Sequence, residues 1–247
     1  MNLSLRPFSL ALLASLSLVP VSATHAGQQQ DYHPSFHPDR LKGPPPGKAN
    51  EVLVLGTAHL SGLPKSFRPE MVAPLIKRLA AWRPTAIATE DLSGLQCDNL
   101  RRYLFRYAST VKDYCPDPSA AGRAVGMDVP AANAEAERLL AAWPAAPAPA
   151  QRRRLAAVFL AAGERASALV QWLRLPEDER HAGDSLDDDA VAALEKLKVR
   201  QNETTLIAAP LAAQLGLERV WGVDDHSADS EVNPSDEAAW DAAISRA

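Results

Sequence analysis

The chain has 247 residues, of which 47% are apolar and 23% charged, with a formal net charge of −4. This length and apolar content can bury a sizeable core in one large domain. The mild acidity argues against a nucleic-acid-binding protein, which needs a basic face.

The first residues, 1–26, are typical of a secretory signal peptide. Arg6 supplies the positive charge, residues 8–21 form a short apolar stretch, and small residues surround Ala23 and Ala26. An uncleaved anchor is the alternative, although a membrane span needs about 20 apolar residues. We therefore expect an exported protein, periplasmic or secreted, with no stable membrane anchor.

Residues 27–50 are rich in Gln, His, Pro and Gly and end in "KGPPPGKAN". This composition predicts an extended arm. The remaining residues, 51–247, are expected to form the folded domain.

The domain begins with a pattern that predicts a βαβ unit. Residues 52–55 (VLVL) are a continuous apolar run, as in a strand covered on both faces. Residues 69–82 follow with helical spacing, the regular helix beginning at Ala73 and stopping before Pro84. Residues 85–89 then predict a second strand, parallel to the first.

Cys97 and Cys115 are the two cysteines of the chain. Export to an oxidising compartment favours a disulfide between them, with two free thiols as the alternative. A metal site built on this pair is disfavoured, because the spacing matches no common ligand pattern.

Residues 99–197 are mostly helical by pattern, and Gly216 is expected to end a further helix. Residues 218–223 predict a third strand that leads into "DDHSAD". The expected fold class is therefore α/β, a mostly parallel sheet with a βαβ start and a large helical middle insertion.

Polar side chains follow each of the three predicted strands. His59 comes after the first, Glu90 after the second, and Asp224, Asp225 and His226 after the third. Open α/β sheets bind ligands outside the carboxyl ends of their strands. Imidazole with carboxylate can hold a divalent metal ion or perform acid–base chemistry without one.

We predict His59 and Glu90 as catalytic residues. The predicted metal ligands are His59, Glu90, Asp224 and His226. Taken singly, each residue also has a structural interpretation: a histidine that caps a turn, a glutamate paired with an arginine, or an aspartate that caps a helix.

Three segments of the sequence together resemble the TraB/Tiki-like superfamily, which includes GumN-like and erythromycin-esterase-like proteins. Gly56 to His59 matches its early Gly-x-x-His, Glu90 its glutamate after the second strand, and Val223 to His226 a Val-Asp-Asp-His found in one exported bacterial branch. The resemblance implies an α/β fold, and among its relatives are metal-dependent proteases, haem binders and proteins of peptide-pheromone signalling.

The superfamily also has a second half, with an Arg-Asn pair and a second Gly-x-x-His, and neither occurs here. The resemblance therefore implies a TraB/Tiki-like domain over 51–247 that is truncated at its C-terminus. Three functions follow as hypotheses. The first is a metal-dependent hydrolase of peptide or ester bonds, acting on a peptide or small-molecule substrate. The second is a binding protein for haem or another small ligand, and the third is an inactive remnant.

Overall fold

The computed structural model describes residues 47–64, 66–229 and 234–245. The chain divides into two units, Met1–Val54 and Leu55–Ala247. The predicted signal peptide and most of the predicted arm lie outside the described residues. The described part of the first unit, 47–54, has no regular secondary structure.

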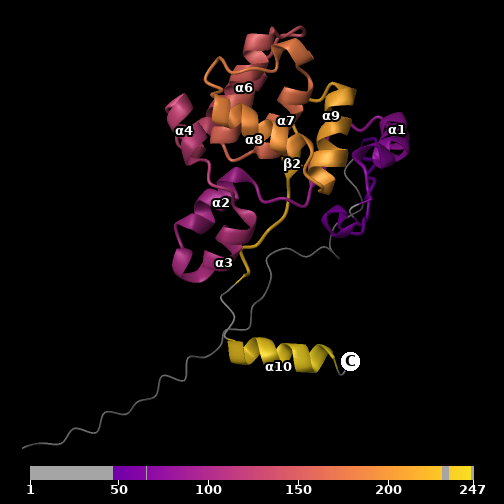
Figure 1. The fold of residues 1–247 in the computed structure, drawn as a ribbon, viewed down its shortest axis with the longest axis vertical. Helices are drawn as coiled ribbons and strands as arrows, with labels where there is room; N and C mark the ends of the chain where they lie inside the picture. The colour runs from indigo at the N-terminus through magenta and orange to yellow at the C-terminus, as the bar shows by residue number, and fades with distance from the viewer. Residues whose placement is uncertain (1–46, 65, 230–233, 246–247) are drawn as a thin grey trace, which may run out of the picture. The chain divides into compact units, whose positions relative to one another are not determined.

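Helices dominate the second unit, so the expected α/β fold with a mostly parallel sheet is wrong. Helices account for 59% of the described residues. The strands in the described part of the chain are β1 (Ala88–Thr89) and β2 (Trp221–Gly222), of two residues each. Figure 1 shows β2 as a short arrow among helices.

The helical elements follow in chain order. They are η2 (Leu60–Gly62), η3 (Pro69–Val72), α1 (Ala73–Trp82), α2 (Gly94–Arg101), α3 (Leu104–Tyr114), α4 (Ser119–Val125), α5 (Val129–Ala141), α6 (Pro149–Ala161), α7 (Arg165–Leu173), η4 (Glu177–Glu179), α8 (Asp188–Lys198), the π-helix η5 (Thr204–Ala208), α9 (Ala209–Leu215) and α10 (Pro234–Ile244). The predicted start of a regular helix at Ala73 and the helix end at Gly216 are confirmed.

The predicted first strand is not a strand. Val52 and Val54 are 81% and 88% exposed, and residues 52–55 make no strand pairing with any part of the chain that the structure describes. An apolar run favours a strand only where a neighbouring strand supplies hydrogen bonds and a layer covers its side chains. With this strand absent, the predicted βαβ unit is absent too.

The main core lies around α6, α7, α8 and α9, which Figure 1 shows packed together. Its largest fully buried side chains are Trp172, Phe159, Leu155 and Leu169. Burial of each such side chain stabilises the fold by about 1.5–3 kcal/mol. The chain turns from α6 into α7 at Gly163, whose φ of 79° favours glycine.

Buried polar side chains of α7 fix the segment that leads into β2. Ser167 is fully buried and its Oγ donates to the carbonyl oxygen of Val220 at 2.9 Å. Gln171, also fully buried, donates from Nε2 to the carbonyl oxygen of Glu218 at 2.6 Å. Because both side chains are rigidly enclosed, α7 sets the position at which β2 begins.

The two strands pair in parallel, Ala88 with Trp221 and Thr89 with Gly222. The predicted second and third strands therefore exist in shorter form. Gly222 is required by close approach, since a Cβ there would lie 2.6 Å from the carbonyl oxygen of Asp91. The pairing brings the carboxyl ends of both strands to the same edge.

Helices α2 and α3 form a disulfide-linked hairpin. The predicted Cys97–Cys115 bridge is confirmed, with Cα atoms 5.4 Å apart, and it packs with Leu100 in a small core of its own. Gly94, at the start of α2, donates its N–H to the buried carboxylate of Glu164 at 2.9 Å. That contact attaches the hairpin to the turn between α6 and α7.

Candidate functional site

The candidate site lies at the carboxyl ends of β1 and β2. Glu90 and Asp91 follow β1, and Asp224 follows β2 two residues on. The backbone N–H of Asp224 donates to the carbonyl oxygen of Asp91 at 3.2 Å. Glu90 is exposed, and its carboxylate has no hydrogen bond or ion pair within the described residues. At this edge the unpaired carboxylate of Glu90 therefore lies next in sequence to Asp91, whose backbone is held by Asp224.

Asp91 is held by a second contact on its side chain. Thr204, the first residue of η5, donates from Oγ1 to Oδ2 of Asp91 at 2.6 Å. π-Helical turns are rare and are often found at functional sites. Asp91 thus links two groups of residues, one through Thr204 and the other through Asp224.

The first group, which we call the Glu203 cluster, consists of Thr57, His59, Leu60, Gln201 and Glu203. Oε1 of Glu203 accepts from the N–H of Leu60 at 2.7 Å and from Oγ1 of Thr57 at 3.2 Å. Gln201 donates from Nε2 to the carbonyl oxygen of Leu60 at 2.6 Å. Glu203 therefore fixes the short helix η2, which begins directly after His59.

His59 itself remains open to solvent. Its side chain is 80% exposed, and Nδ1 lies 3.8 Å from Oε1 of Glu203. The backbone at Gly56 has a negative φ and open space around it, so no sharp glycine turn aims His59. The sequence interpretation placed His59 with Glu90 and missed Glu203, although "QNETT" before an apolar helix was a signal for polar side chains near a helix start.

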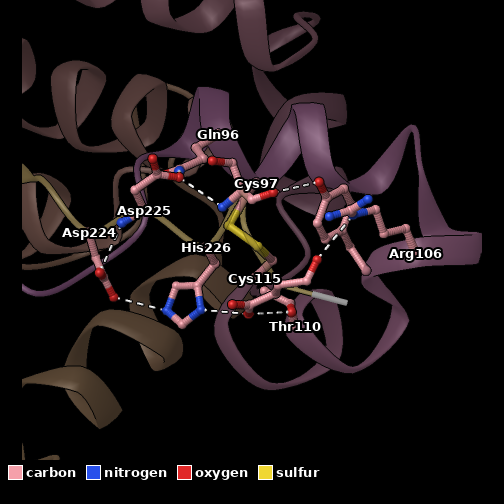
Figure 2. Close-up of polar contacts among 11 residues, drawn as sticks. Gln96, Cys97, Arg106, Thr110, Cys115, Asp224, Asp225 and His226 are labelled. Carbon is pink, nitrogen blue, oxygen red and sulfur yellow. Dashed lines mark hydrogen bonds and ion pairs between the residues drawn. A yellow bond between two sulfur atoms is a disulfide. The ribbon is translucent and has the colours of Figure 1, made fainter. Parts of the chain in front are cut away.

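The second group, the His226 cluster, consists of Thr110, Tyr114, Asp224, His226 and Asp229. Nε2 of His226 lies 2.9 Å from Oδ2 of Asp224, and Nδ1 lies 2.8 Å from Oδ2 of Asp229. The ring stacks on Tyr114 with centroids 4.4 Å apart. Thr110 donates from Oγ1 to Oδ2 of Asp229 at 2.8 Å. Figure 2 shows the imidazole between its acidic partners.

The charges of this cluster stabilise one another. Burial alone lowers the pKa of His226, but the hydrogen bond to Asp229 and the charges of Asp224 and Asp229 outweigh it, and that pKa is raised. Burial alone raises the pKa of Asp229, but the hydrogen bonds from His226 and Thr110 outweigh it, and that pKa is lowered. The cluster therefore favours an imidazolium between carboxylates.

The loop 224–229 is also attached to the disulfide hairpin (Figure 2). Gln96 donates from Nε2 to Oδ1 of Asp225 at 2.7 Å, and Arg106 donates from Nε to the carbonyl oxygen of Asp229 at 3.1 Å. Tyr107 donates from its hydroxyl to the carbonyl oxygen of Ser227 at 2.8 Å. The hairpin thus supports one side of the site.

Arg165, at the start of α7, adds a positive charge close to Asp91. It is half-buried, and its side chain has no hydrogen bond or ion pair within the residues that the structure describes. The pKa of Arg165 is lowered, mainly by burial and to a smaller extent by the charge of Arg200. The charge of Asp91 acts in the opposite direction. The charges of Asp91 and Arg200 therefore both act on Arg165.

The four predicted metal ligands do not form one ready-made set. Asp224 and His226 lie together, His59 lies near Glu203, and Glu90 stands alone. Both ring nitrogens of His226 already face carboxylates. Within the described residues, no group of three His, Cys, Asp or Glu side chains is placed to hold a metal ion. The arrangement fits acid–base chemistry better than this metal site.

No family model, curated protein or solved structure matches the chain. The resemblance to the TraB/Tiki-like superfamily therefore stays a prediction. None of the helices in the described ranges is both long and apolar enough to span a bilayer. The disulfide is consistent with an extracellular protein.

Proposed function

We propose that the chain is an exported hydrolase of peptide or ester bonds whose acid–base site lies at the carboxyl ends of β1 and β2. The observation that carries this proposal is the parallel register, which puts Glu90 beside a segment that ends in the Asp224–His226 pair. A free carboxylate at this edge can act first as base and then as acid, which are the two proton transfers that hydrolysis needs.

In this proposal Glu90 is the general base. Its carboxylate is exposed and unpaired within the described part of the chain, so it can take a proton from a water molecule that attacks the substrate carbonyl. Glu90 then passes this proton to the leaving group, while His226, bonded on both ring nitrogens, holds the loop after β2 in place.

The test is hydrolysis of an activated ester and of a labelled peptide mixture by the purified full chain. Glu90→Gln keeps the size of the side chain but removes the base, and we expect kcat/KM to fall by about 10²-fold or more. Glu70→Gln is the matched control, since Glu70 is an exposed glutamate in η3, and this variant should keep full activity. Unchanged activity in Glu90→Gln would refute the role of Glu90.

A separate experiment tests whether the chain binds the predicted divalent metal ion. Elemental analysis of the purified chain, with and without His59→Ala, shows whether an ion is bound and whether His59 holds it. If a stoichiometric ion is found, the ligands of the hydrolase must be assigned anew, because the described residues form no such group.

Haem or small-ligand binding without catalysis is the second candidate, favoured by the exposure of His59. Its imidazole is 80% exposed, whereas both nitrogens of His226 are occupied. An axial haem ligand needs an available ring nitrogen. A Soret band on haem titration that disappears in His59→Ala and persists in His226→Ala would favour this function.

A further inference from the structure

An exposed aromatic and aliphatic surface, which we call the tip, lies where α2 meets α3. The tip consists of Tyr103, Leu104 and Phe105, which are 52%, 51% and 84% exposed. Three consecutive large apolar side chains in solvent are unusual, because burial of each would be favourable. The rings of Tyr103 and Phe105 meet edge to face at 6.4 Å. The tip is therefore a small, ordered apolar surface.

Basic residues flank the tip in the sequence, Arg101 and Arg102 before it and Arg106 after it. Residues 94–114 carry four basic and two acidic side chains, a net charge of +2, whereas the whole chain carries −4. Arg101 donates to the carbonyl oxygens of Cys115 and Pro116, and Arg106 donates to the carbonyl oxygen of Asp229. These hydrogen bonds go to neutral groups, and within the described residues neither guanidinium forms an ion pair, although the charge of Arg101 acts on Asp117.

Lys112 is a third cation of this kind. It is exposed and makes no hydrogen bond or ion pair within the described ranges. Arg102 differs, because it pairs with Asp98 at 2.6 Å. The hairpin thus combines an apolar tip with unneutralised positive charge.

The disulfide constrains the hairpin that carries this surface. Cys97 and Cys115 join the start of α2 to the end of α3, and the tip lies in the turn between the two helices. Figure 1 shows α2 and α3 side by side, and they are the elements that carry the tip. A constrained hairpin loses little conformational entropy when it binds, which favours binding through few residues.

We infer that this tip docks reversibly on an anionic lipid surface. Aromatic and aliphatic side chains enter the boundary between headgroups and acyl chains, and arginine and lysine side chains attract anionic headgroups. Apolar area alone would suit a protein partner as well. The net positive charge of residues 94–114 favours a negatively charged surface, and the small apolar area favours shallow insertion over a stable anchor.

The test is co-sedimentation of the full oxidised chain with vesicles. Vesicles of equal parts phosphatidylglycerol and phosphatidylcholine should bind the chain, and pure phosphatidylcholine vesicles should bind it much more weakly. Raising NaCl to about 0.5 M should reduce binding to the anionic vesicles several-fold, since salt screens exposed charges. Equal binding to both vesicle types would overturn the inference.

Variants separate the tip from other exposed apolar residues. Phe105→Asp should weaken vesicle binding about tenfold or more, and Lys112→Glu should weaken it several-fold. Val199→Asp is the matched control, because Val199 is 65% exposed and lies outside the hairpin. Circular dichroism checks that each variant is folded. If Phe105→Asp binds as well as the unmodified chain, the tip is not the docking site.

Two further outcomes are decisive. Brominated lipid in anionic vesicles should quench the tryptophan fluorescence of Phe105→Trp more strongly than that of the unmodified chain. Absence of that extra quenching would overturn insertion of the tip. Binding to polyglutamate that requires Phe105 and Lys112, with no binding to vesicles, would instead assign the surface to an acidic polypeptide.

Discussion

At the scale of single residues, His226 connects the loop after β2 to α3. Its side chain is only 19% exposed, and each ring nitrogen faces a carboxylate. Only the doubly protonated ring can donate to both Asp224 and Asp229. The loop 224–229 is therefore held by a charge whose pKa is raised above its ordinary value of 6.5.

The pH dependence of stability follows from the directions of these pKa shifts. The pKa of His226 is raised above its ordinary value of 6.5, so its stabilising contribution is complete below pH 6.5 and is lost as pH rises through the folded-state pKa. The pKa of Asp229 is lowered from 3.8, so its contribution is present above pH 3.8 and is lost on further acidification. The contacts of the His226 cluster therefore stabilise the fold most between pH 3.8 and pH 6.5.

We therefore predict that the free energy of unfolding by urea falls by about 1 kcal/mol between pH 5.5 and pH 8.5, the order expected for one charge-assisted hydrogen bond. His226→Gln should remove most of this pH dependence. His181→Gln, at an exposed histidine that contacts Glu179, serves as control and should keep it. If the free energy of unfolding of His226→Gln depends on pH as strongly as that of the unmodified chain, the prediction is contradicted.

The residues of the site could be predicted only in part. Asp224 and His226 are two residues apart, so their pairing after a strand was visible in the sequence. Glu203 and Thr204 lie more than a hundred residues from the partners they bind, Leu60 and Asp91. Such contacts depend on how helices pack, and the local sequence carries no information on that packing.

At the scale of elements, the close approach of β2 to the chain after β1 fixes the edge of the site. A Cβ at position 222 would lie 2.6 Å from the carbonyl oxygen of Asp91 and 3.2 Å from the backbone nitrogen of Ser93. Only glycine permits this distance without a shift of one backbone segment. The position of Asp91 relative to Asp224 depends on it.

Gly222→Ala should therefore destabilise the fold by about 1–3 kcal/mol, as overpacking does, and should lower hydrolytic activity beyond the loss of folded protein. Thermal unfolding and activity per folded molecule measure the two effects. Gly62→Ala is the control, because that position has open space and an ordinary φ. Equal stability of the two variants would show that the strands can separate at little cost.

Elements with strong local signals were predicted correctly. Helix α1 starts at Ala73 and ends before Pro84, and Gly216 ends α9 in the left-handed region with φ of 78°. The strand predicted at 52–55 was wrong, because a strand is stabilised by partners distant in the sequence. An apolar run specifies burial only if another part of the chain covers it.

At the scale of the whole molecule, a helical scaffold carries a minimal pair of strands. The core of α6 to α9 is large, and the strands add little buried area to it. The predicted sheet was too extensive because each apolar run at a suitable spacing was assigned to one sheet. In the structure, β1 and β2 are sufficient to place Glu90, Asp91 and Asp224 at one edge.

The parallel pairing of β1 with β2 has a consequence for the order of folding. Oγ1 of Thr89 donates to the carbonyl oxygen of Trp221, 132 residues away, while α6 and α7 are neighbours in sequence. Distant contacts close large loops and form slowly, and local helical contacts form first.

The amides of Trp221 and Val223 bond to the carbonyl oxygens of Ile87 and Thr89. Pulse-labelling hydrogen exchange during refolding should show that these two amides become protected later than the amides of α6 and α7. Protection of both sets in a single phase would contradict this order. If α6 and α7 are protected first, the helical scaffold exists for a time before the proposed site at the strand ends is complete. A refolding chain would regain its helical signal while it remained inert, and recovery of activity would lag behind recovery of structure.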